Sequence, residues 1–429
     1  MPPLPRSTQV LVVGGGPAGS STAWHLAKEG LDVTLIDRAH FPRPKPCAEY
    51  VSPEGARLLN AMGALQALER EGAGLTGMQV HAPSGDVIHG EFVAQHGFRG
   101  FRDRGIGIRR EILDTTLLAC AREAGVRVVE GAKVDTVLHE GGTTLGARVR
   151  TSEGTRDVRA SLLVGADGLR SVVARRLGLA RSSRWPRRIA LVAHYRGVRG
   201  IGTLGEMHVT RDGYIGLAAV GGGVTNVALV VPTSRVSSMR GDPAGFLARW
   251  IDARPALRER FAGSERVAPV RATGPFASHA VRAWAPGALL VGDAADFYDP
   301  FTGEGIYAAL LGGELAAPYA VDAVRALERG AARTSDQALG GYERARRRAF
   351  AGKWRVEKAI GAAVAQPWLM NHAARVLGHD RDLADLLVGV TGDFVPPSAV
   401  LTPSVLLRFL VPRRSRRTHS PSPLHVHRP

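Results

Sequence analysis

Cysteine is scarce in this chain of 429 residues, which contains only Cys47 and Cys120. Two cysteines form at most one disulfide bond, which excludes the disulfide framework of small secreted domains and favours a reducing compartment. The first residues lack the apolar stretch and cleavage site of a signal peptide, and no apolar run reaches about 18 residues. The sequence therefore predicts a cytoplasmic protein without a transmembrane helix.

Acidic residues and lysines are also few. The 56 basic residues outnumber the 39 acidic ones, which gives a net charge of +17, and only five of the 56 are lysines. No basic stripe, helix-turn-helix or zinc-finger spacing accompanies this charge, so we expect no nucleic-acid partner. The 14 histidines form no H-x-x-x-H pair and no cluster with cysteine, so no metal site is predicted.

Glycine, in contrast, is abundant, and several of the 52 glycines lie in one motif near the N-terminus. An apolar run from Val10 to Val13 is followed by GGGPAG, a helical stretch that ends at Gly30, and a second strand that ends at Asp37. This order of strand, turn, helix and strand is typical of the opening of a doubly wound parallel sheet that binds a dinucleotide.

The residues of this turn suit a pyrophosphate. Gly14 permits the tight turn, Gly16 lets the pyrophosphate approach the backbone, and Gly19 lets the helix pack closely on the strand. The N-terminus of the helix offers free amides and a partial positive charge. Asp37 follows at the distance expected of the acid that binds a ribose diol.

Two later segments again place an acid beside glycine after an apolar strand. GADG contains Asp167 and Gly168, and GDAAD contains Asp293. Ligands bind at the carboxyl ends of parallel strands, so Asp37 and the two later acids are expected to converge on one extended dinucleotide. PFTGEGIYAAL, residues 300–310, is typical of a glycine loop that leads into a helix whose N-terminus points at the ligand.

On these motifs the chain resembles the glutathione-reductase-type flavoproteins of the para-hydroxybenzoate hydroxylase fold, and within them the geranylgeranyl reductase family, which is related to the flavin halogenases. The resemblance covers about residues 8–400. It implies an α/β fold with a Rossmann FAD domain, a substrate domain built on a mixed or antiparallel sheet, and a helical C-terminal part. The expected boundaries are 7–74, 101–180 and 285–330 for the discontinuous FAD domain, 75–100 and 181–284 for the substrate domain, 331–410 for the helical region, and 411–429 for a basic, disordered tail.

The resemblance also implies roles toward FAD for individual residues. Arg109 corresponds to the arginine that opens the helix beside the cofactor, the backbone at Val134 to the adenine contact, and Asp293 to the acid that holds the ribityl chain. The glycine loop would face the flavin N1 and O2 edge, where negative charge collects on reduction. The residues expected to bind FAD are Gly14, Gly16, Pro17, Ala18, Gly19, Asp37, Arg38, Arg109, Val134, Asp167, Gly168, Asp293, Gly303, Gly305 and Ile306.

Three residues are candidates for a part in catalysis: Cys47, Tyr214 and Glu304. In the segment FPRPKPCAEY the resemblance places Lys45, Cys47 and Glu49 near the flavin, and cationic neighbours would favour the thiolate form of Cys47. The alternative is a small apolar cysteine in the core. Glu304 either orients the glycine loop or takes part in the chemistry.

The expected substrate wall departs from the family pattern. Reductases of long isoprenoids usually show an aromatic Y-x-W-x-F-P strand, whereas YIGLAA keeps Tyr214 and has Gly216, Ala218 and Ala219 at the other positions. Halogenases of this group need a lysine downstream of the cysteine segment, yet no lysine lies between Lys45 and Lys133 and no W-x-W-x-I-P motif is present. Halogenation is therefore not expected.

These observations favour an FAD-dependent oxidoreductase that reduces carbon–carbon double bonds of a hydrophobic, isoprenoid-like substrate by hydride transfer from reduced flavin. The expected electron donor is NAD(P)H or a reduced redox protein of ferredoxin or flavodoxin type. Two alternatives stay open: an FAD-dependent monooxygenase that hydroxylates an aromatic or polyketide substrate, and a membrane-associated flavoprotein that only transfers electrons.

The C-terminus predicts a further partner. An apolar patch at residues 406–411 precedes Arg413, Arg414, Arg416 and Arg417. This composition is typical of a peripheral anchor on an anionic membrane surface. The alternative is that the apolar side chains pack on the domain and the arginines are solvated.

The first prediction concerns the cofactor. The purified protein is expected to be yellow and to carry FAD, and Asp293→Ala is expected to weaken FAD binding by about 1.5 to 3 kcal/mol because it removes a charge-assisted hydrogen bond. Titration of the apoprotein with FAD measures this difference. A folded, colourless protein that cannot be reconstituted with FAD would contradict the assignment.

Overall fold

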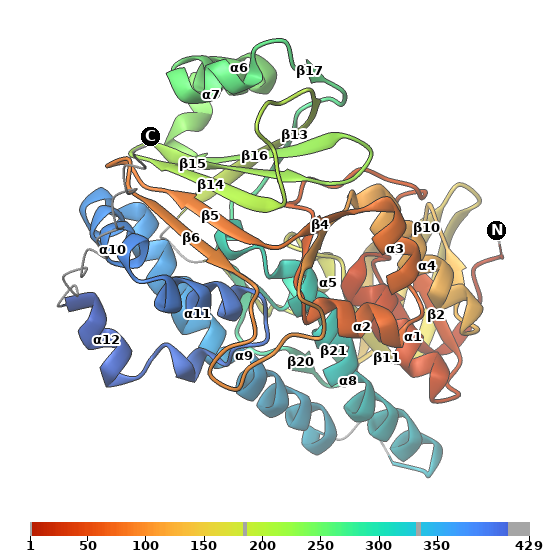
Figure 1. Ribbon diagram of the computed structural model, residues 1–429. Helices are drawn as coiled ribbons and strands as arrows, with labels where there is room; N and C mark the ends of the chain where they lie inside the picture. The colour runs from red at the N-terminus through yellow and green to blue at the C-terminus, as the bar shows by residue number, and fades with distance from the viewer. Residues whose placement is uncertain (1, 183–186, 332–335, 411–429) are drawn as a thin grey trace, which may run out of the picture.

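The computed structural model describes residues 2–182, 187–331 and 336–410 (Figure 1). Its elements form two large sheets, with helices between and around them. The expected α/β fold is confirmed. The expected basic tail, residues 411–429, lies outside the described residues.

The first sheet has a parallel centre. Its strands follow the order β20-β21-β11-β1-β2-β8, and β9 and β10 continue it antiparallel beyond β11. The strands are β1 (Ser7–Val13), β2 (Val33–Ile36), β8 (Arg127–Val129), β9 (Lys133–Glu140), β10 (Thr143–Thr151), β11 (Gly154–Gly165), β20 (Trp284–Ala285) and β21 (Ala288–Leu290). Val10, Leu11 and Leu35 are fully buried, as expected of a parallel sheet covered on both faces.

Helices α1 (Pro17–Lys28), α4 (Arg110–Glu123) and α8 (Gly305–Glu328) pack around the parallel centre of this sheet. The contact between α1 and α8 requires a glycine, because a Cβ atom on Gly313 would lie 2.6 Å from the Ser21 hydroxyl oxygen. The Ser21 hydroxyl also donates to the Leu310 carbonyl at 2.8 Å. These contacts fix the N-terminus of α8 relative to the glycine loop that precedes α1.

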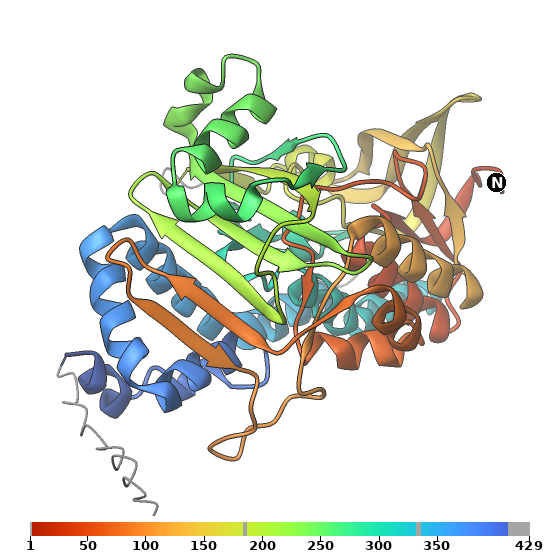
Figure 2. The ribbon, with the colours of Figure 1, turned by 45° about the horizontal axis from the view of Figure 1, so that its top comes forward.

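The second sheet is mostly antiparallel, in the order β17-β13-β16-β15-β14-β5-β6. Figure 2 shows β5 and β6, from the first hundred residues, beside the strands of residues 188–232. The strands are β5 (Gly77–His81), β6 (Val87–Glu91), β13 (Arg188–Arg196), β14 (Leu204–Thr210), β15 (Gly213–Ala219), β16 (Val224–Pro232), β17 (Glu265–Arg266) and β18 (Arg271–Thr273), which pairs with β13. Helices α6 (Pro243–Asp252) and α7 (Pro255–Phe261) cover one face, which leaves the other face toward the first sheet.

Short elements connect the two sheets. One small sheet contains β3 (Tyr50–Val51), β4 (Ala73–Leu75) and β7 (Gly105–Gly107). Another contains β12 (Ala180–Ser182), β19 (Ser278–Ala280) and β22 (Asp296–Phe297). The short helices are α2 (Gly55–Ala61), α3 (Leu65–Glu71) and α5 (Val172–Arg176).

The C-terminal helices close the molecule beside β6 (Figure 1). They are α9 (Asp336–Ala365), α10 (Pro367–His379), α11 (Arg381–Thr391) and α12 (Pro403–Leu410). Helix α11 lies so close to β6 that a Cβ atom on Gly90 would be 2.4 Å from a Val388 methyl group. No helix among the described residues combines the length and the apolar character needed to cross a bilayer.

Candidate functional site

The loop between β1 and α1 forms an anion cradle. Gly14 has a φ of 108°, and a Cβ atom there would lie 2.4 Å from the Ala166 carbonyl oxygen. A Cβ atom on Gly19 would lie 1.8 Å from the Gly14 carbonyl oxygen. At Gly16 the nearest atoms to a Cβ are guanidinium nitrogens of Arg43 and Arg110, at 3.6 and 3.7 Å. An anion beside Gly16 would therefore meet the N-terminus of α1 and two arginines.

Asp37 is buried at the end of β2, beside this loop. Its two carboxylate oxygens accept hydrogen bonds from the Gly15 amide at 2.7 Å and the Ala39 amide at 2.8 Å. The Ala132 amide donates to the Asp37 carbonyl at 2.8 Å, which brings the start of β9, and with it the buried Val134, toward the same region. Arg38 is exposed.

The arginine beside the cradle is Arg110 rather than the expected Arg109. Arg110 is buried and makes two hydrogen bonds to Asp114, at 2.8 and 2.7 Å, and Asp114 also lies 3.3 Å from Arg43. Arg109 precedes the first turn of α4 with extended backbone and lines a separate cavity. The spacing R-E-I-L-D from Arg110 to Asp114 is a sequence signal for the correct residue, because side chains four apart meet on a helix.

The cradle opens into a cavity of about 170 Å³ between the two sheets. Most of its wall is apolar, and the second sheet contributes Val192, Met207, Ala228 and Val230. Ten of the residues singled out in the sequence line it: Gly16, Pro17, Ala18, Cys47, Gly168, Tyr214, Asp293, Gly303, Gly305 and Ile306. The cavity thus joins an anion-binding end to a hydrophobic chamber.

Asp167 has a different position from the other predicted acids. One of its carboxylate oxygens accepts from the Val172 amide at 2.6 Å and the Val173 amide at 3.3 Å, so the side chain caps α5 instead of lining the cavity. Burial raises the pKa of Asp167. The next residue, Gly168, has a φ of 80° and reaches the cavity wall.

The loop before β3 is held from behind by Glu49. This residue is buried, and its φ of 59° lies in the left-handed region that disfavours side chains. One carboxylate oxygen accepts from the Arg110 amide at 2.9 Å, and the other from His194 Nε2 at 2.7 Å and Asn226 Nδ2 at 2.8 Å. Asn226 also donates to the Cys47 carbonyl at 3.0 Å. Sequence reasoning named Glu49 but gave no signal for His194 and Asn226.

Lys45 lies between the anion-binding end and the wall. A Cβ atom on Gly168 would be 3.6 Å from the Lys45 ammonium nitrogen. Burial, and then the nearby Arg110, lower the pKa of Lys45, while Asp293 acts in the opposite direction. The ammonium group therefore favours a further anion nearby.

Glu304 and Tyr214 are both tied to residues outside the main cavity. The buried Glu304 lies 3.1 Å from the Lys353 ammonium of α9, and it lines a second cavity behind the glycine loop. The Tyr214 hydroxyl donates to Asp299 at 2.6 Å, and Asp299 pairs with Arg188 at 2.7 Å. Burial and Asp299 raise the pKa of Tyr214 well above its usual value. The Tyr214 ring lines the cavity, while its hydroxyl is already engaged.

The FAD binding domain family matches residues 7–349 of this chain. Digeranylgeranylglycerophospholipid reductase 2 of Methanopyrus kandleri is 30% identical over 322 residues, which cover 73% of this chain and 77% of that protein. The chain belongs to the FAD-binding family that includes this reductase.

Two solved structures are similar to this flavoprotein. The myxobacterial chondrochloren halogenase has a TM-score of 0.75 at 26% identity, over 83% of this chain and 82% of that one. The geranylgeranyl bacteriochlorophyll reductase-like protein of Thermoplasma acidophilum has a TM-score of 0.69 at 25% identity, over 94% and 96%. The expected relationship to geranylgeranyl reductases and flavin halogenases is confirmed.

The residues present fit FAD. The cradle at Gly16, with the guanidinium groups of Arg43 and Arg110 beside it, suits the pyrophosphate, and the buried Asp37 suits a ribose. Asp293, Gly303 and Gly305 line the chamber beyond the cradle, where the ribityl chain and the flavin ring of a bound FAD would follow. Residues of both sheets line this cavity, so both would contact a bound FAD.

One group of possible metal ligands occurs among the described residues: His81, Glu206 and His208. Arg260 donates to both carboxylate oxygens of Glu206, one of them at 2.8 Å. Burial opposes ionisation of Glu206, but the hydrogen bonds from Arg260 and His208 lower its pKa to about 2. The guanidinium thus already supplies the positive charge, and we assign no metal to this group.

The second prediction separates the two arginines of α4. Arg110→Met is expected to weaken FAD binding at least about tenfold, because a charged hydrogen-bond donor to the pyrophosphate is lost. Arg109→Met, the matched control, is expected to bind FAD within about twofold of wild type. Titration of each apoprotein with FAD, after its thermal unfolding is checked, measures both. An equal loss of FAD affinity in Arg109→Met would contradict the assignment of Arg110 to the pyrophosphate.

Proposed function

We propose that this flavoprotein is an FAD-dependent oxidoreductase that reduces carbon–carbon double bonds of a hydrophobic, isoprenoid-like substrate. The observation that carries the proposal is the single cavity that joins the anion cradle at Gly16 to the apolar wall of the second sheet. The relatives named as digeranylgeranylglycerophospholipid reductases support an isoprenoid chain as the occupant of the apolar part.

The chain's own residues would bind and orient the reactants. Gly16, Arg110 and α1 would hold the pyrophosphate, and Asp293 would accept hydrogen bonds from ribityl hydroxyls. FAD, when bound and reduced by the electron donor, would supply the hydride. The N-terminus of α8 at Gly305 would favour negative charge on the adjacent ring edge, because the helix dipole is positive there. The apolar wall would keep water away from the reacting carbons.

Cys47 is the side chain of the loop that best fits a direct part in the reaction. It is half-buried and lines the cavity, and its carbonyl is fixed by Asn226. A thiol held there would touch the substrate or the ring face of the cofactor. The alternative, that Cys47 is a structural cysteine of the apolar core, also has support, because Cys47 packs against the apolar cluster around Val51.

The β15 strand would give the substrate room. Gly216 and Ala218 line the cavity at positions where the resembled isoprenoid reductases have aromatic side chains. The chamber is therefore widened by small residues, and we propose a substrate that is bulkier or differently bent at this point. The electron donor would be NAD(P)H or a small reduced redox protein.

The third prediction tests the reaction. Anaerobic incubation of photoreduced holoprotein with an isoprenoid such as geranylgeraniol is expected to yield products two mass units heavier per reduced double bond, by mass spectrometry. Oxidised protein is the control. Substrate-triggered oxygen uptake with a gain of 16 mass units, measured aerobically, would identify a monooxygenase. Electron transfer to a quinone without a modified isoprenoid would identify the electron-transfer alternative.

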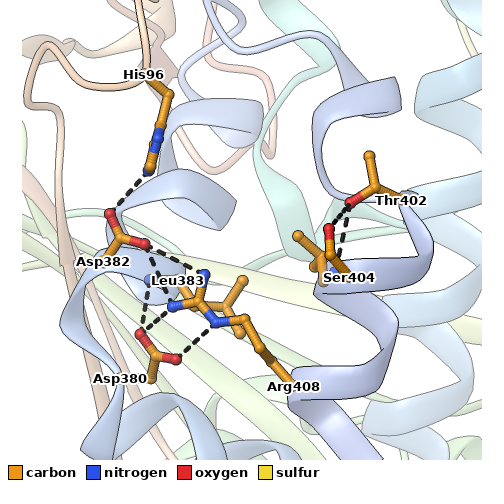
Figure 3. A network of polar contacts seen from close by, with 8 residues as sticks. His96, Asp380, Asp382, Leu383, Thr402, Ser404 and Arg408 are labelled. Atoms are coloured by element: carbon orange, nitrogen blue, oxygen red, sulfur yellow. Dashed lines mark hydrogen bonds and ion pairs between the residues drawn. The ribbon is translucent and has the colours of Figure 1, made fainter.

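We further propose that α12 docks the protein on an anionic membrane. Its side chains Leu406 and Leu407 are 50% and 59% exposed. The helix is nevertheless held firmly: Arg408 bonds to Asp380 at 2.9 Å and to Asp382 at 3.2 Å (Figure 3). The leucines therefore stay outward, and the next residues of the chain, 411–429, contain five arginines and no acid.

The network around Arg408 ties α12 to two other parts of the chain. His96, from the long loop after β6, lies 2.8 Å from Asp382, and His372 of α10 contacts the Phe409 carbonyl at 2.6 Å. At the start of the helix the Thr402 hydroxyl accepts from the Val405 amide at 3.4 Å. A helix fixed at both ends presents a preformed apolar surface, which lowers the entropy lost on docking.

The fourth prediction tests this docking. Vesicles of phosphatidylglycerol and phosphatidylcholine are expected to co-sediment with the full chain, and Leu406→Gln/Leu407→Gln or a chain that ends at Leu410 is expected to pellet several-fold less. Val236→Gln, at another apolar residue that is 48% exposed, is the matched control. Equal pelleting of all four proteins would show that neither α12 nor the C-terminal arginines bind the membrane.

A further inference from the structure

Reduction of a carbon–carbon double bond consumes one proton besides the hydride, and several polar groups of the main cavity, the one between the two sheets, are already engaged. The Tyr214 hydroxyl and the Asn226 amide donate to carboxylates. The Arg110 guanidinium is paired with Asp114 and also hydrogen-bonds to Cys47, whose sulfur is the acceptor because a guanidinium can only donate. The proton must therefore come from another group of the wall.

Tyr50 of β3 carries an unengaged proton. The residue is buried and lines the main cavity, and its hydroxyl oxygen has no hydrogen-bond partner among the residues that the structure describes. Its ring packs on the glycine loop before α8, since a Cβ atom on Gly303 would lie 2.9 Å from the Tyr50 Cδ1 atom. Burial, and then the charge of Glu304, raise the pKa of Tyr50 well above its usual value. The phenol therefore stays protonated until a strong base forms beside it.

Behind the glycine loop, Glu304 and Glu357 hold another proton. Both line the second cavity, which has a volume of about 60 Å³. Their side chains are joined by a hydrogen bond, and two carboxyl groups form one only if one of them is protonated. Burial, and then the charge of Glu304, raise the pKa of Glu357 well above its usual value. The pair therefore shares a proton at neutral pH.

The charges around the pair favour this proton. Lys353 lies 3.1 Å from Glu304 and also pairs with Asp393, so one ammonium serves two carboxylates. A proton on Glu357 lowers the negative charge that the group must bury. The groups that surround the pair are Lys353 and Arg346 of α9, Arg188 of β13, Asp293, Asp296 and Asp299 between β21 and α8, Asp393 after α11, and the phenols of Tyr298, Tyr307 and Tyr342.

The positions of these groups connect solvent to the main cavity. Glu357 is half-buried on α9 and so is in contact with solvent, whereas Glu304 is buried. Asp293, Phe297 and Gly305 line both cavities, so the two adjoin beside the glycine loop. The second cavity has room for about two water molecules, and water can bridge polar groups that do not touch.

We propose that Glu357, Glu304 and Tyr50 form a proton relay that supplies the reaction from solvent. As the hydride passes from reduced flavin to one carbon of the double bond, the Tyr50 O–H bond breaks and its proton forms a C–H bond at the other carbon. The carboxyl pair then returns a proton to the phenolate, and Glu357 takes one from water. The flavin is oxidised and the alkene is reduced, so the electrons balance. The inference rests on the proposed function and adds its catalytic acid, Tyr50.

The first experiment follows the flavin. Photoreduced, FAD-loaded protein is mixed anaerobically with geranylgeraniol, and the returning absorbance of oxidised flavin gives the rate. Tyr50→Phe is expected to slow this step at least about a hundredfold, because general acids contribute about 10² to 10⁴ in rate. Oxidation by ferricyanide, which takes electrons but no proton, is expected to be unchanged. Tyr195→Phe, at a residue that packs on Phe261 of α7 and lines neither cavity, is the matched control.

Variants of Glu357 test the supply of the proton. Glu357→Gln is expected to leave the first oxidation by geranylgeraniol intact, because Tyr50 is already protonated, and to slow the later turnovers under continuous photoreduction several-fold. Glu357→Asp keeps a carboxyl and is expected to recover much of this rate. Wild-type turnover is expected to fall as the pH rises through the raised pKa of Glu357, and Glu357→Gln is expected to lose this dependence. Later turnovers of Glu357→Gln at the wild-type rate would overturn the supply through the pair.

A spectroscopic measurement tests the shared proton without turnover. The infrared difference spectrum between oxidised wild-type holoprotein and Glu357→Gln, at neutral pH, is expected to contain the carbonyl band of a protonated carboxyl. The band is expected to shift in D2O, because the proton exchanges with solvent through Glu357. A difference spectrum without this band would overturn the pair as a proton store.

The outcomes separate the relay from the proposed function. Geranylgeraniol that wild type cannot reduce would contradict both. Reduction that is as fast in Tyr50→Phe as in wild type would overturn the relay and leave the reductase. A loss in Tyr50→Phe that oxidation by ferricyanide shares would overturn the role of Tyr50 as proton donor. Because Tyr50→Phe removes only a hydroxyl without a partner among the described residues, the variant is expected to fold, and its thermal unfolding checks this.

Discussion

The carboxylate of Glu49 joins the three parts of the molecule that surround the cavity. It binds the first turn of α4 through the Arg110 amide, and the second sheet through His194 and Asn226. A hydrogen bond to a charged group typically contributes about 1.5 to 3 kcal/mol, so these bonds can hold Glu49 in a backbone conformation that costs about 1 to 3 kcal/mol. The position of the Cys47 loop depends on this balance.

Other loops around the cavity are also held by a buried carboxylate that binds a group outside the cavity. Lys353 of α9 binds Glu304 at the N-terminus of α8, and Asp167 caps α5 below the turn at Gly168. The carboxylates of Glu49, Asp167 and Glu304 bind these anchors. The chamber can therefore remain apolar even though charged residues border it on every side.

Local patterns in the sequence predicted the first sheet and the cradle well, because Gly14, Gly19 and Asp37 act within one strand-turn-helix-strand unit. The structure places Arg110, and not the expected Arg109, beside the cradle, because one residue at the start of a helix turns a side chain by about 100°. The direction of Glu304 was not predictable, since Lys353 lies 49 residues away in the chain. The partners of Glu49 are separated from it by 145 and 177 residues, and only the folded chain brings them together.

The small side chains of β15 have a consequence for how this protein could diversify. Gly216 and Ala218 belong to the second sheet, whereas the pyrophosphate cradle belongs to the first. A single larger side chain on β15 would narrow the chamber without altering the loop between β1 and α1. The side-chain sizes of this strand can thus set how bulky a ligand the chamber accepts.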